Sequence, residues 1–119
     1  MNLRQIALAF SNGNFEQTME YFADDVEWII VGEKIFKGKN AVIEYCRTIS
    51  EYFNSVETDF KTINVISSNK CVAVSGTAEF KRNNERVAFV YACDIYEFNN
   101  LNKLRRITSY CIQDNIEFV

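Results

Sequence analysis

The sequence contains no histidine and no proline, and only four of its 119 residues are glycine. Without histidine, the chain lacks the commonest metal ligand and the commonest general base of enzymes. The four cysteines, Cys46, Cys71, Cys93 and Cys111, lie far apart in the sequence and form no CxxC motif. A zinc site would need thiols brought together from four separate elements, so we expect reduced, buried cysteines, no metal and no cofactor.

Charge and hydropathy exclude further classes of function. The net charge is −3 and the pI is about 5.0, which argues against a nucleic-acid partner because phosphate binding needs a basic face. No apolar run approaches the ~18 residues of a membrane span, and no secretory signal opens the chain. We therefore expect a cytoplasmic protein without a membrane partner, folded as one domain over residues 1–119.

Three segments show the apolar spacing of amphipathic helices, at about 3–10, 15–22 and 40–53. Four extended segments follow from about residue 56 to residue 113, joined by short connections. Short connections favour an antiparallel meander, and helices followed by strands indicate an α+β fold.

The extended segment 86–98 carries one carboxylate, Asp94, among apolar neighbours. If this strand pairs across Asn83 and Asn84 with Arg82 opposite Glu85, Asp94 lies opposite Ala73. Its face then holds mainly small residues, namely Ala73, Ser75, Thr77, Ala88, Val90 and Ala92. The opposite face holds large residues, namely Val72, Val74, Phe80, Val87, Phe89, Tyr91 and Ile95. Either the small face lines a cavity under the helices, or it faces solvent and the large face forms the core. A register shift of one residue would break this assignment.

Three stretches in order carry a family resemblance: NGNFEQTMEYFADDVEW, then the F-x-G of FKG, then CDIYEFNNLNKLRRITSY. In this order and spacing they resemble the nuclear transport factor 2-like superfamily, on its SnoaL-like and ketosteroid-isomerase-like side. The resemblance implies a cone, in which three N-terminal helices pack on the concave side of a strongly curved antiparallel sheet around an apolar pocket. It also implies a homodimer formed through the outer sheet face.

On this resemblance, the face of Asp94 points inward and Asp94 is the candidate catalytic residue. The residues expected to line the ligand pocket are Trp28, Tyr45, Ile49, Tyr52, Phe53, Ser75, Thr77, Val90, Ala92, Ile107, Ser109 and Cys111. The residues expected at the dimer interface are Val72, Val74, Phe80, Phe89 and Tyr91. The expected ligand is a small hydrophobic molecule.

The catalytic residues of the family carry over only in part. Asp94 aligns with the acid that ketosteroid isomerases keep protonated as a hydrogen-bond donor. Their general base aligns with Ile29 and their oxyanion tyrosine with Ile6, so ketosteroid isomerase activity is not expected. SnoaL-like cyclases can use a single acid as base, although a second aspartate that they commonly carry is replaced here by Ile112.

Two functions stay open. The chain is either a cofactor-independent isomerase, cyclase or hydratase that uses Asp94 on a hydrophobic carbonyl compound, or a non-catalytic domain. The non-catalytic domain would bind a small ligand, form a homodimeric accessory unit or bind another protein.

Overall fold

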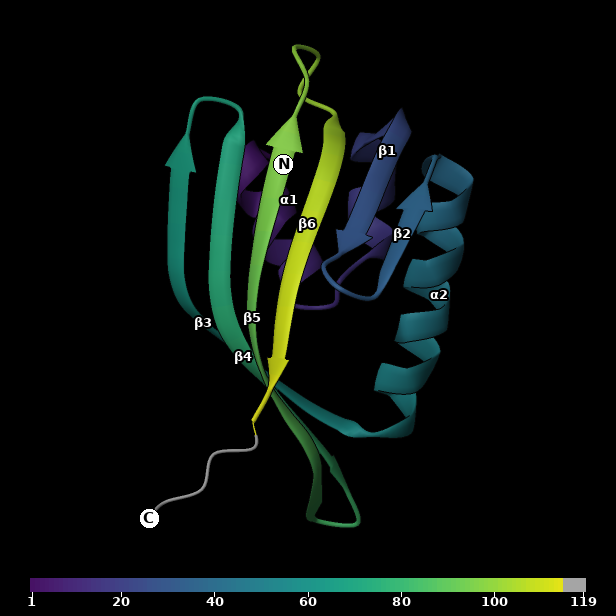
Figure 1. Ribbon diagram of the computed structural model, residues 1–119, viewed down its shortest axis with the longest axis vertical. Coiled ribbons are helices and arrows are strands. Elements are labelled where there is room, and N and C mark those ends of the chain that lie inside the picture. The colour runs from purple at the N-terminus through teal and green to yellow at the C-terminus, as the bar shows by residue number, and fades with distance from the viewer. Residues whose placement is uncertain (115–119) are drawn as a thin grey trace.

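The computed structural model of the protein describes residues 1–114; residues 115–119, which were predicted to belong to the same domain, lie outside the described part. In chain order the elements are α1 (Leu3–Ser11), the 3₁₀ helix η1 (Glu16–Tyr21), β1 (Phe22–Ile30), β2 (Lys34–Lys37), α2 (Lys39–Ser55), β3 (Glu57–Ser68), β4 (Cys71–Arg82), β5 (Glu85–Phe98) and β6 (Leu104–Gln113). Within the described residues, the strands form one six-stranded sheet in the order β2-β1-β6-β5-β4-β3 (Figure 1).

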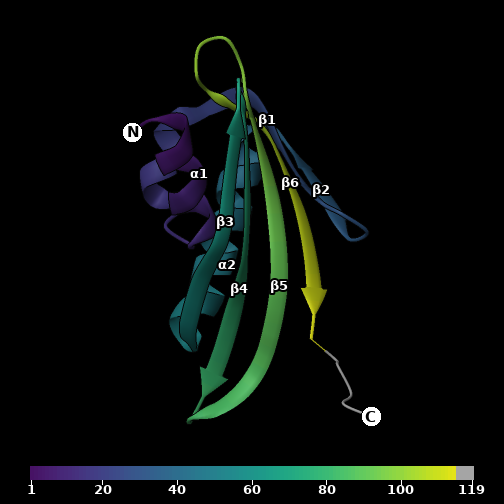
Figure 2. The same cartoon turned by 90° about the vertical axis from the view of Figure 1, so that its left-hand side faces the viewer.

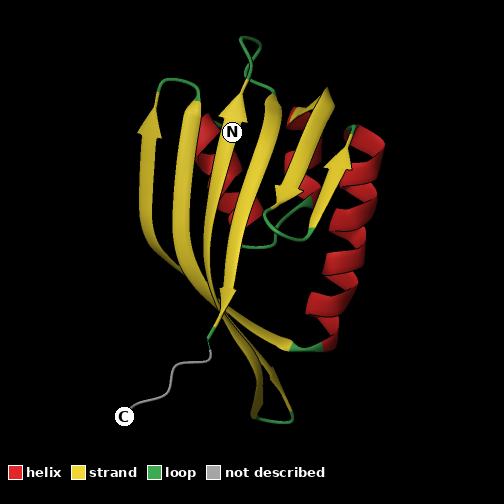
Figure 3. Ribbon diagram, in the orientation of Figure 1, coloured by secondary structure: helices red, strands yellow, loops and turns green. Residues whose placement is uncertain are grey.

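The sheet is strongly curved, and both α-helices lie on its concave side (Figure 2). The convex face, which is turned to the viewer in Figure 3, carries no helix from residues 1–114. This arrangement confirms the predicted α+β fold with helices packed on a curved sheet. None of the helices in the described part has the length and apolar character that crossing a membrane requires.

Of the three predicted helices, two are α-helices and the second is a short 3₁₀ helix. At the start of α1, the Asn2 side chain accepts a hydrogen bond from the Gln5 backbone N–H at 2.8 Å, and the Gln5 side chain accepts one from the Asn2 backbone N–H at 2.9 Å. This capping box fixes where α1 begins. η1 has only six residues, a length at which 3₁₀ turns are frequent, so the prediction of an amphipathic helix over 15–22 is corrected.

The sheet is mixed, whereas the prediction was fully antiparallel. β3, β4, β5 and β6 form the expected antiparallel meander. β1, however, runs parallel to β6, with Trp28 opposite Ile107 and Ile30 opposite Ser109. Parallel neighbours need a long connection between them, and here α2 and four strands, β2 to β5, provide it.

A β-bulge in β5 shifts the register of the β4–β5 hairpin. Lys81 pairs with Arg86, but Phe80 pairs with Ala88, so Val87 has no partner in the ladder. One extra residue in a strand moves every later pair by one position. Asp94 therefore lies opposite Val74 and not opposite Ala73.

The shifted register reverses the predicted faces of β4 but keeps those of β5. Val90, Ala92 and Asp94 border the space under the helices, as predicted. On β4 the residues opposite them are Ala78, Gly76 and Val74. The assignment of three predicted interface residues to the outer face is consequently wrong, because all three are buried: Val72, Val74 and Phe80.

The core fills much of the space between the helices and the concave face. Its largest fully buried side chains are Tyr96, Ile6, Leu104 and Ile107. Elsewhere on that face the sheet presents small residues, and β3 and β4 approach very closely. A Cβ atom on Gly76 would lie 2.3 Å from the Lys61 carbonyl oxygen, so no side chain fits at this point of the sheet.

Candidate active site

Asp94 borders a cavity of about 300 Å³ between the helices and the concave face of the sheet. Most of the residues that line it are apolar or aromatic, with contributions from α1, β1, α2 and β3 to β6. A cavity of this size with a few polar groups is typical of a small-molecule site. The geometry around Asp94 therefore decides what chemistry the cavity can support.

Ser11 connects Asp94 to a buried tyrosine. The Ser11 hydroxyl, at the end of α1, donates to the Asp94 carboxyl oxygen Oδ2 at 3.1 Å, and its oxygen lies 2.5 Å from the Tyr96 hydroxyl. Tyr96 is 0% exposed. A hydroxyl has only one proton. Since Ser11 gives its proton to Asp94, Tyr96 is the donor in the second hydrogen bond.

A second relay reaches Asp94 from β1 and β6. Ser109 lies directly opposite Asp94 in the sheet, and its hydroxyl acts to lower the pKa of the Asp94 carboxyl. The Ser109 oxygen accepts a hydrogen bond from the indole N–H of Trp28 at 2.9 Å. Because an indole can only donate, the Ser109 proton is left for Asp94. Both relays thus present hydrogen-bond donors to the same carboxyl group.

Burial and hydrogen bonding act on Asp94 in opposite directions. Burial raises the pKa of Asp94 above its ordinary value, and the neighbouring hydroxyl groups of Ser109, Ser11 and Tyr96 partly offset this rise. Burial also raises the pKa of Tyr96 well above 10, and the nearby Asp94 charge raises it further. No ion pair joins Asp94 to a lysine or arginine within residues 1–114. Asp94 is therefore a stronger base than a solvated carboxylate, and Tyr96 stays protonated.

Cys111 and Tyr45 line the cavity beyond Asp94. Cys111 lies opposite Ala92. Burial, with smaller contributions from the charges of Asp94 and Glu33, raises the pKa of its thiol to about 11. Such a thiol is protonated near neutral pH and is a poor nucleophile. The Tyr45 ring stacks on Phe36 at 4.0 Å between centroids, and burial followed by the Glu33 charge raises its pKa.

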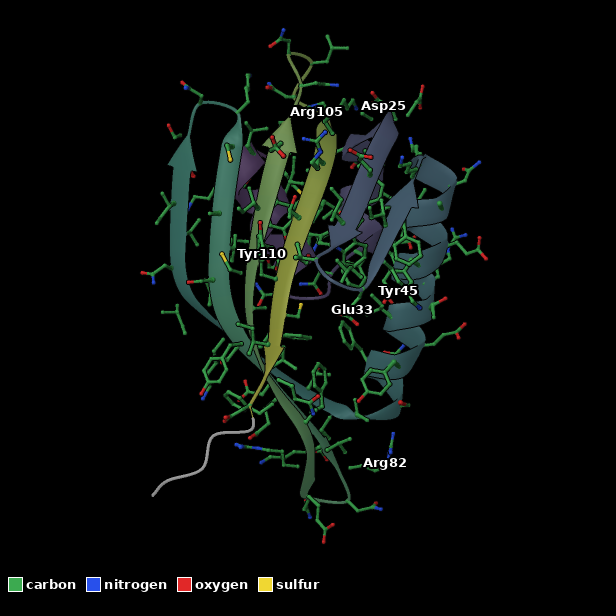
Figure 4. The ribbon with its side chains drawn as sticks, in the orientation of Figure 1. Asp25, Glu33, Tyr45, Arg82, Arg105 and Tyr110 are labelled. Atoms are coloured by element: carbon green, nitrogen blue, oxygen red, sulfur yellow. The ribbon has the colours of Figure 1, made fainter. Side chains whose placement is uncertain are left out.

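Glu33 reaches the same region from the turn between β1 and β2. Figure 4 shows Glu33 and Tyr45 on the same side of the molecule, between that turn and α2. Within residues 1–114, no group of three or more histidine, cysteine, aspartate or glutamate side chains could hold a metal ion.

The structure brings most of the predicted site residues to one cavity. The predicted residues that border it are Trp28, Tyr45, Ile49, Phe53, Thr77, Val90, Ala92, Asp94, Ser109 and Cys111. Three others lie elsewhere. Tyr52 is 41% exposed, Ser75 lies opposite Cys93 because of the bulge in β5, and Ile107 is fully buried in the core. The catalytic or binding role of each residue stays a prediction.

Sequence reasoning missed both partners in the first relay to Asp94, Ser11 and Tyr96. Tyr96 stands two positions after Asp94 in the same strand, so strand periodicity alone places both on one face. That signal was present in the sequence. Ser11 lies 83 positions from Asp94, so no local pattern connected it to the site.

The chain is similar to known proteins over most of its length. The sequence model of the family described as "SnoaL-like domain" matches residues 3–107. Among solved structures, an NTF2-like protein of unknown function from Cytophaga hutchinsonii is 34% identical, with 91% of this chain and 94% of that chain covered and a TM-score of 0.82. No curated protein matches the sequence.

Two more distant structures share the fold. An LEH-like epoxide hydrolase of M. tuberculosis is 15% identical, with 92% of this chain and 82% of that chain covered and a TM-score of 0.70. The epoxide hydrolase/cyclase-like enzyme SalBIII, described in pyran ring formation in the polyether salinomycin, is 17% identical, with 92% and 90% covered and a TM-score of 0.70.

Proposed function

Because the chain belongs to the SnoaL-like domain family, we propose that it is a cofactor-independent enzyme in which Asp94 moves a proton on a small apolar molecule. The substrate would carry a carbonyl group next to an acidic C–H bond, and the reaction would be of the isomerase, cyclase or hydratase type. Fold neighbours described as epoxide hydrolases and as an epoxide hydrolase/cyclase-like enzyme support chemistry on small molecules in such a cavity.

The observation that carries this proposal is the set of donors around Asp94. Ser11 donates to the carboxyl at 3.1 Å, and Ser109 has its proton free for the carboxyl because it accepts from Trp28. Hydrogen-bond donors around a carboxyl group favour its ionised form, because a carboxylate only accepts hydrogen bonds. Since burial also raises its pKa, Asp94 is better suited to act as a general base than a solvated carboxylate is.

In the proposed mechanism, Asp94 takes a proton from the carbon beside the substrate carbonyl, and the C–H electron pair moves into an enolate. Return of the proton to another carbon completes an isomerisation, whereas attack by the enolate carbon within the same molecule completes a cyclisation. Tyr45 is placed to donate to the enolate oxygen, because it borders the cavity and its hydroxyl makes no hydrogen bond within residues 1–114. The apolar walls keep bulk water from the carboxylate.

A model elimination reaction, which does not require the natural substrate to be known, tests whether Asp94 acts as a base. In a nitro-substituted benzisoxazole, one base takes the proton from the ring carbon, the N–O bond breaks, and a nitrile and a coloured phenolate form. We expect Asp94→Asn to lower the rate by about a hundredfold. Asp59→Asn is the matched control, because Asp59 is exposed and its one ion pair within residues 1–114 is with Lys61 at 3.7 Å.

The pH profile gives a second measurement of the same base. The wild-type rate is expected to rise with pH and level off above the pKa of Asp94, which burial places above the ordinary carboxyl range. A rate no higher than that of acetate at equal concentration, or an equal rate in Asp94→Asn, would overturn the proposal.

A second candidate function is ligand binding without catalysis, and two positions favour it. Where ketosteroid isomerases carry their tyrosine and their base, this chain has Ile6, which is buried in the core, and Ile29, which lies opposite Thr108. Asp94 would then only orient a bound ligand. Binding of small ketones in the cavity, without any effect of Asp94→Asn on the probe reaction, would support this function over the first.

We also propose that the chain forms a homodimer through the convex face of the sheet. After the correction of the β4 register, Phe89 and Tyr91 remain from the predicted interface, and Ile112 lies opposite Tyr91. Ile112 is 67% exposed and Tyr110, labelled in Figure 4, is 45% exposed. Apolar residues gathered on one exposed face of a sheet favour association.

A further inference from the structure

We propose that the cavity selects its ligand by charge, and that Glu33 is the residue that sets this selection. The ligand class is a compact apolar molecule that is uncharged where it meets Asp94 and carries a cationic group, such as a protonated amine, toward Glu33. Anionic molecules would be excluded. This inference rests on the proposed function, because the ligand concerned is the substrate of the same site.

The charges along the cavity are unbalanced. Asp94, Glu33 and Lys61 are the charged residues that border it. Lys61, however, pairs with Asp59 at 3.7 Å and its side chain is 72% exposed. Its backbone carbonyl oxygen lies against Gly76 of the neighbouring strand. The side-chain charges that face a ligand are therefore two carboxylates without a compensating cation.

The backbone holds Glu33 in place at the edge of the cavity. Its N–H donates to the Ile30 carbonyl at 2.9 Å across a turn in which Gly32 has a φ of 79°. Such a positive φ at the third turn residue is the position that glycine fills in type II turns. The neighbouring Val31 N–H donates to the Ser109 carbonyl at 3.0 Å. The turn is thus tied to β6, close to Asp94 and its hydrogen-bond partner.

Glu33 acts on other cavity groups and has no ionic partner of its own. Its negative charge contributes to the raised pKa of both Tyr45 and Cys111, which places it within electrostatic reach of two walls. No ion pair to Glu33 occurs within residues 1–114. The next residue, Lys34, has its Nζ 6.0 Å from the Tyr45 ring centroid and forms no ion pair with Glu33 within residues 1–114. Glu33 is therefore free to pair with a ligand cation.

The aromatic walls act in the same direction as the carboxylates. Trp28 and Tyr45 meet edge-to-face at 5.3 Å between centroids, and the faces of such rings attract cations. An anion would meet the exposed carboxylate of Glu33 at the rim of the cavity, and the buried carboxylate of Asp94 and the ring faces inside it, which is unfavourable for a negative charge. A cation could instead pair with a carboxylate and contact the aromatic ring faces in the same region.

A matched set of probes tests the selection in the intact protein. Naphthylmethylamine, naphthylmethanol and naphthoate share one ring system and are cationic, neutral and anionic near neutral pH. Trp28 is the single tryptophan, so its indole N–H signal in an NMR titration reports binding at the cavity wall. We expect the amine to bind about tenfold more tightly than the alcohol, and the alcohol at least about tenfold more tightly than the naphthoate.

Variants of Glu33 test whether its charge causes the preference for the cationic probe. Glu33→Gln is expected to remove most of the preference for the amine, and Glu33→Lys to favour the naphthoate over the amine. Glu44→Gln makes the same change of charge on α2 outside the cavity lining and should leave all three affinities unchanged.

The outcomes distinguish this inference from the function on which it rests. Equal binding of the three probes, or an unchanged preference in Glu33→Gln, would overturn the charge selection while leaving the role of Asp94 intact. Retained selection with no effect of Asp94→Asn on the benzisoxazole reaction would overturn the catalytic function alone. No shift of the Trp28 signal with any probe would overturn both.

Discussion

Replacement of Ser11 by alanine removes the link between Asp94 and Tyr96. The Ser11 hydroxyl takes part in two hydrogen bonds, at 3.1 Å to Asp94 and at 2.5 Å to Tyr96. A buried hydrogen bond contributes about 1 kcal/mol to stability after exchange with water is counted. Ser11→Ala should therefore lower the free energy of unfolding by about 2 kcal/mol.

A double-mutant cycle with Tyr96→Phe isolates the shared hydrogen bond. Tyr96→Phe alone removes one bond and should cost about 1 kcal/mol, while the double variant should cost about 2 kcal/mol. The three values give a coupling energy of about 1 kcal/mol between the two side chains. Urea unfolding followed by the fluorescence of Trp28, which is only 6% exposed, measures all three.

The control uses the same unfolding assay, and the refuting result combines that assay with an NMR titration. Ser55→Ala removes a hydroxyl that donates to the Tyr52 carbonyl at an exposed helix end, and it should change stability by less than about 0.5 kcal/mol. Because the Ser11 hydrogen bond lowers the pKa of Asp94, Ser11→Ala should also raise that pKa, measured at the carboxyl carbon by NMR. A coupling energy near zero together with an unmoved Asp94 pKa would refute the relay.

Three other predictions concern the sheet, the pH dependence and the convex face. Gly76→Ala should destabilise the protein by about 2 to 3 kcal/mol, because the new Cβ would meet the Lys61 carbonyl oxygen at 2.3 Å; a thermal unfolding curve that matches the wild type would contradict this. Burial raises the pKa of Asp94, so the folded protein keeps this proton to a higher pH than the unfolded chain. The stability that the protonated Asp94 contributes is complete below the pKa of an unfolded carboxyl and is lost as the pH rises through the folded pKa. Asp94→Asn should lack this decline, and parallel pH profiles of unfolding free energy would count against it. Ile112→Glu should convert a homodimer into monomers in sedimentation equilibrium, and a wild-type protein that is already monomeric would disprove the interface.

The sequence determines the elements of this fold more clearly than their pairing. Helical spacing identified α1 and α2, and the run of extended segments identified β3 to β6. The register of β4 against β5 depended on one residue, Val87, which is left without a partner. No local pattern marks Val87 as different from its apolar neighbours, because a bulge is stabilised by packing over the whole sheet. The face of β4 was therefore predicted incorrectly while the face of β5 was predicted correctly.

The candidate site shows the same division between local and distant information. Asp94, Ser109 and Trp28 were predicted from strand periodicity and the family resemblance; in the structure Trp28 donates a hydrogen bond to Ser109, and Ser109 lies opposite Asp94. Ser11 was missed, because its role depends on where the end of α1 meets β5. The acidic side of the cavity at Glu33 was missed for a similar reason, since a turn residue gives no sign in sequence of which cavity it borders.

The position of β6 has a consequence for how the chain folds. β6 is the last strand in sequence among the described residues, yet it lies between β1 and β5 in the middle of the sheet. Until β6 is synthesised, one edge of β1 and one edge of β5 have no strand to pair with. Contacts between residues far apart in sequence slow folding, and unpaired strand edges invite association with other chains. The nascent chain is thus most prone to aggregation just before residues 104–113 leave the ribosome.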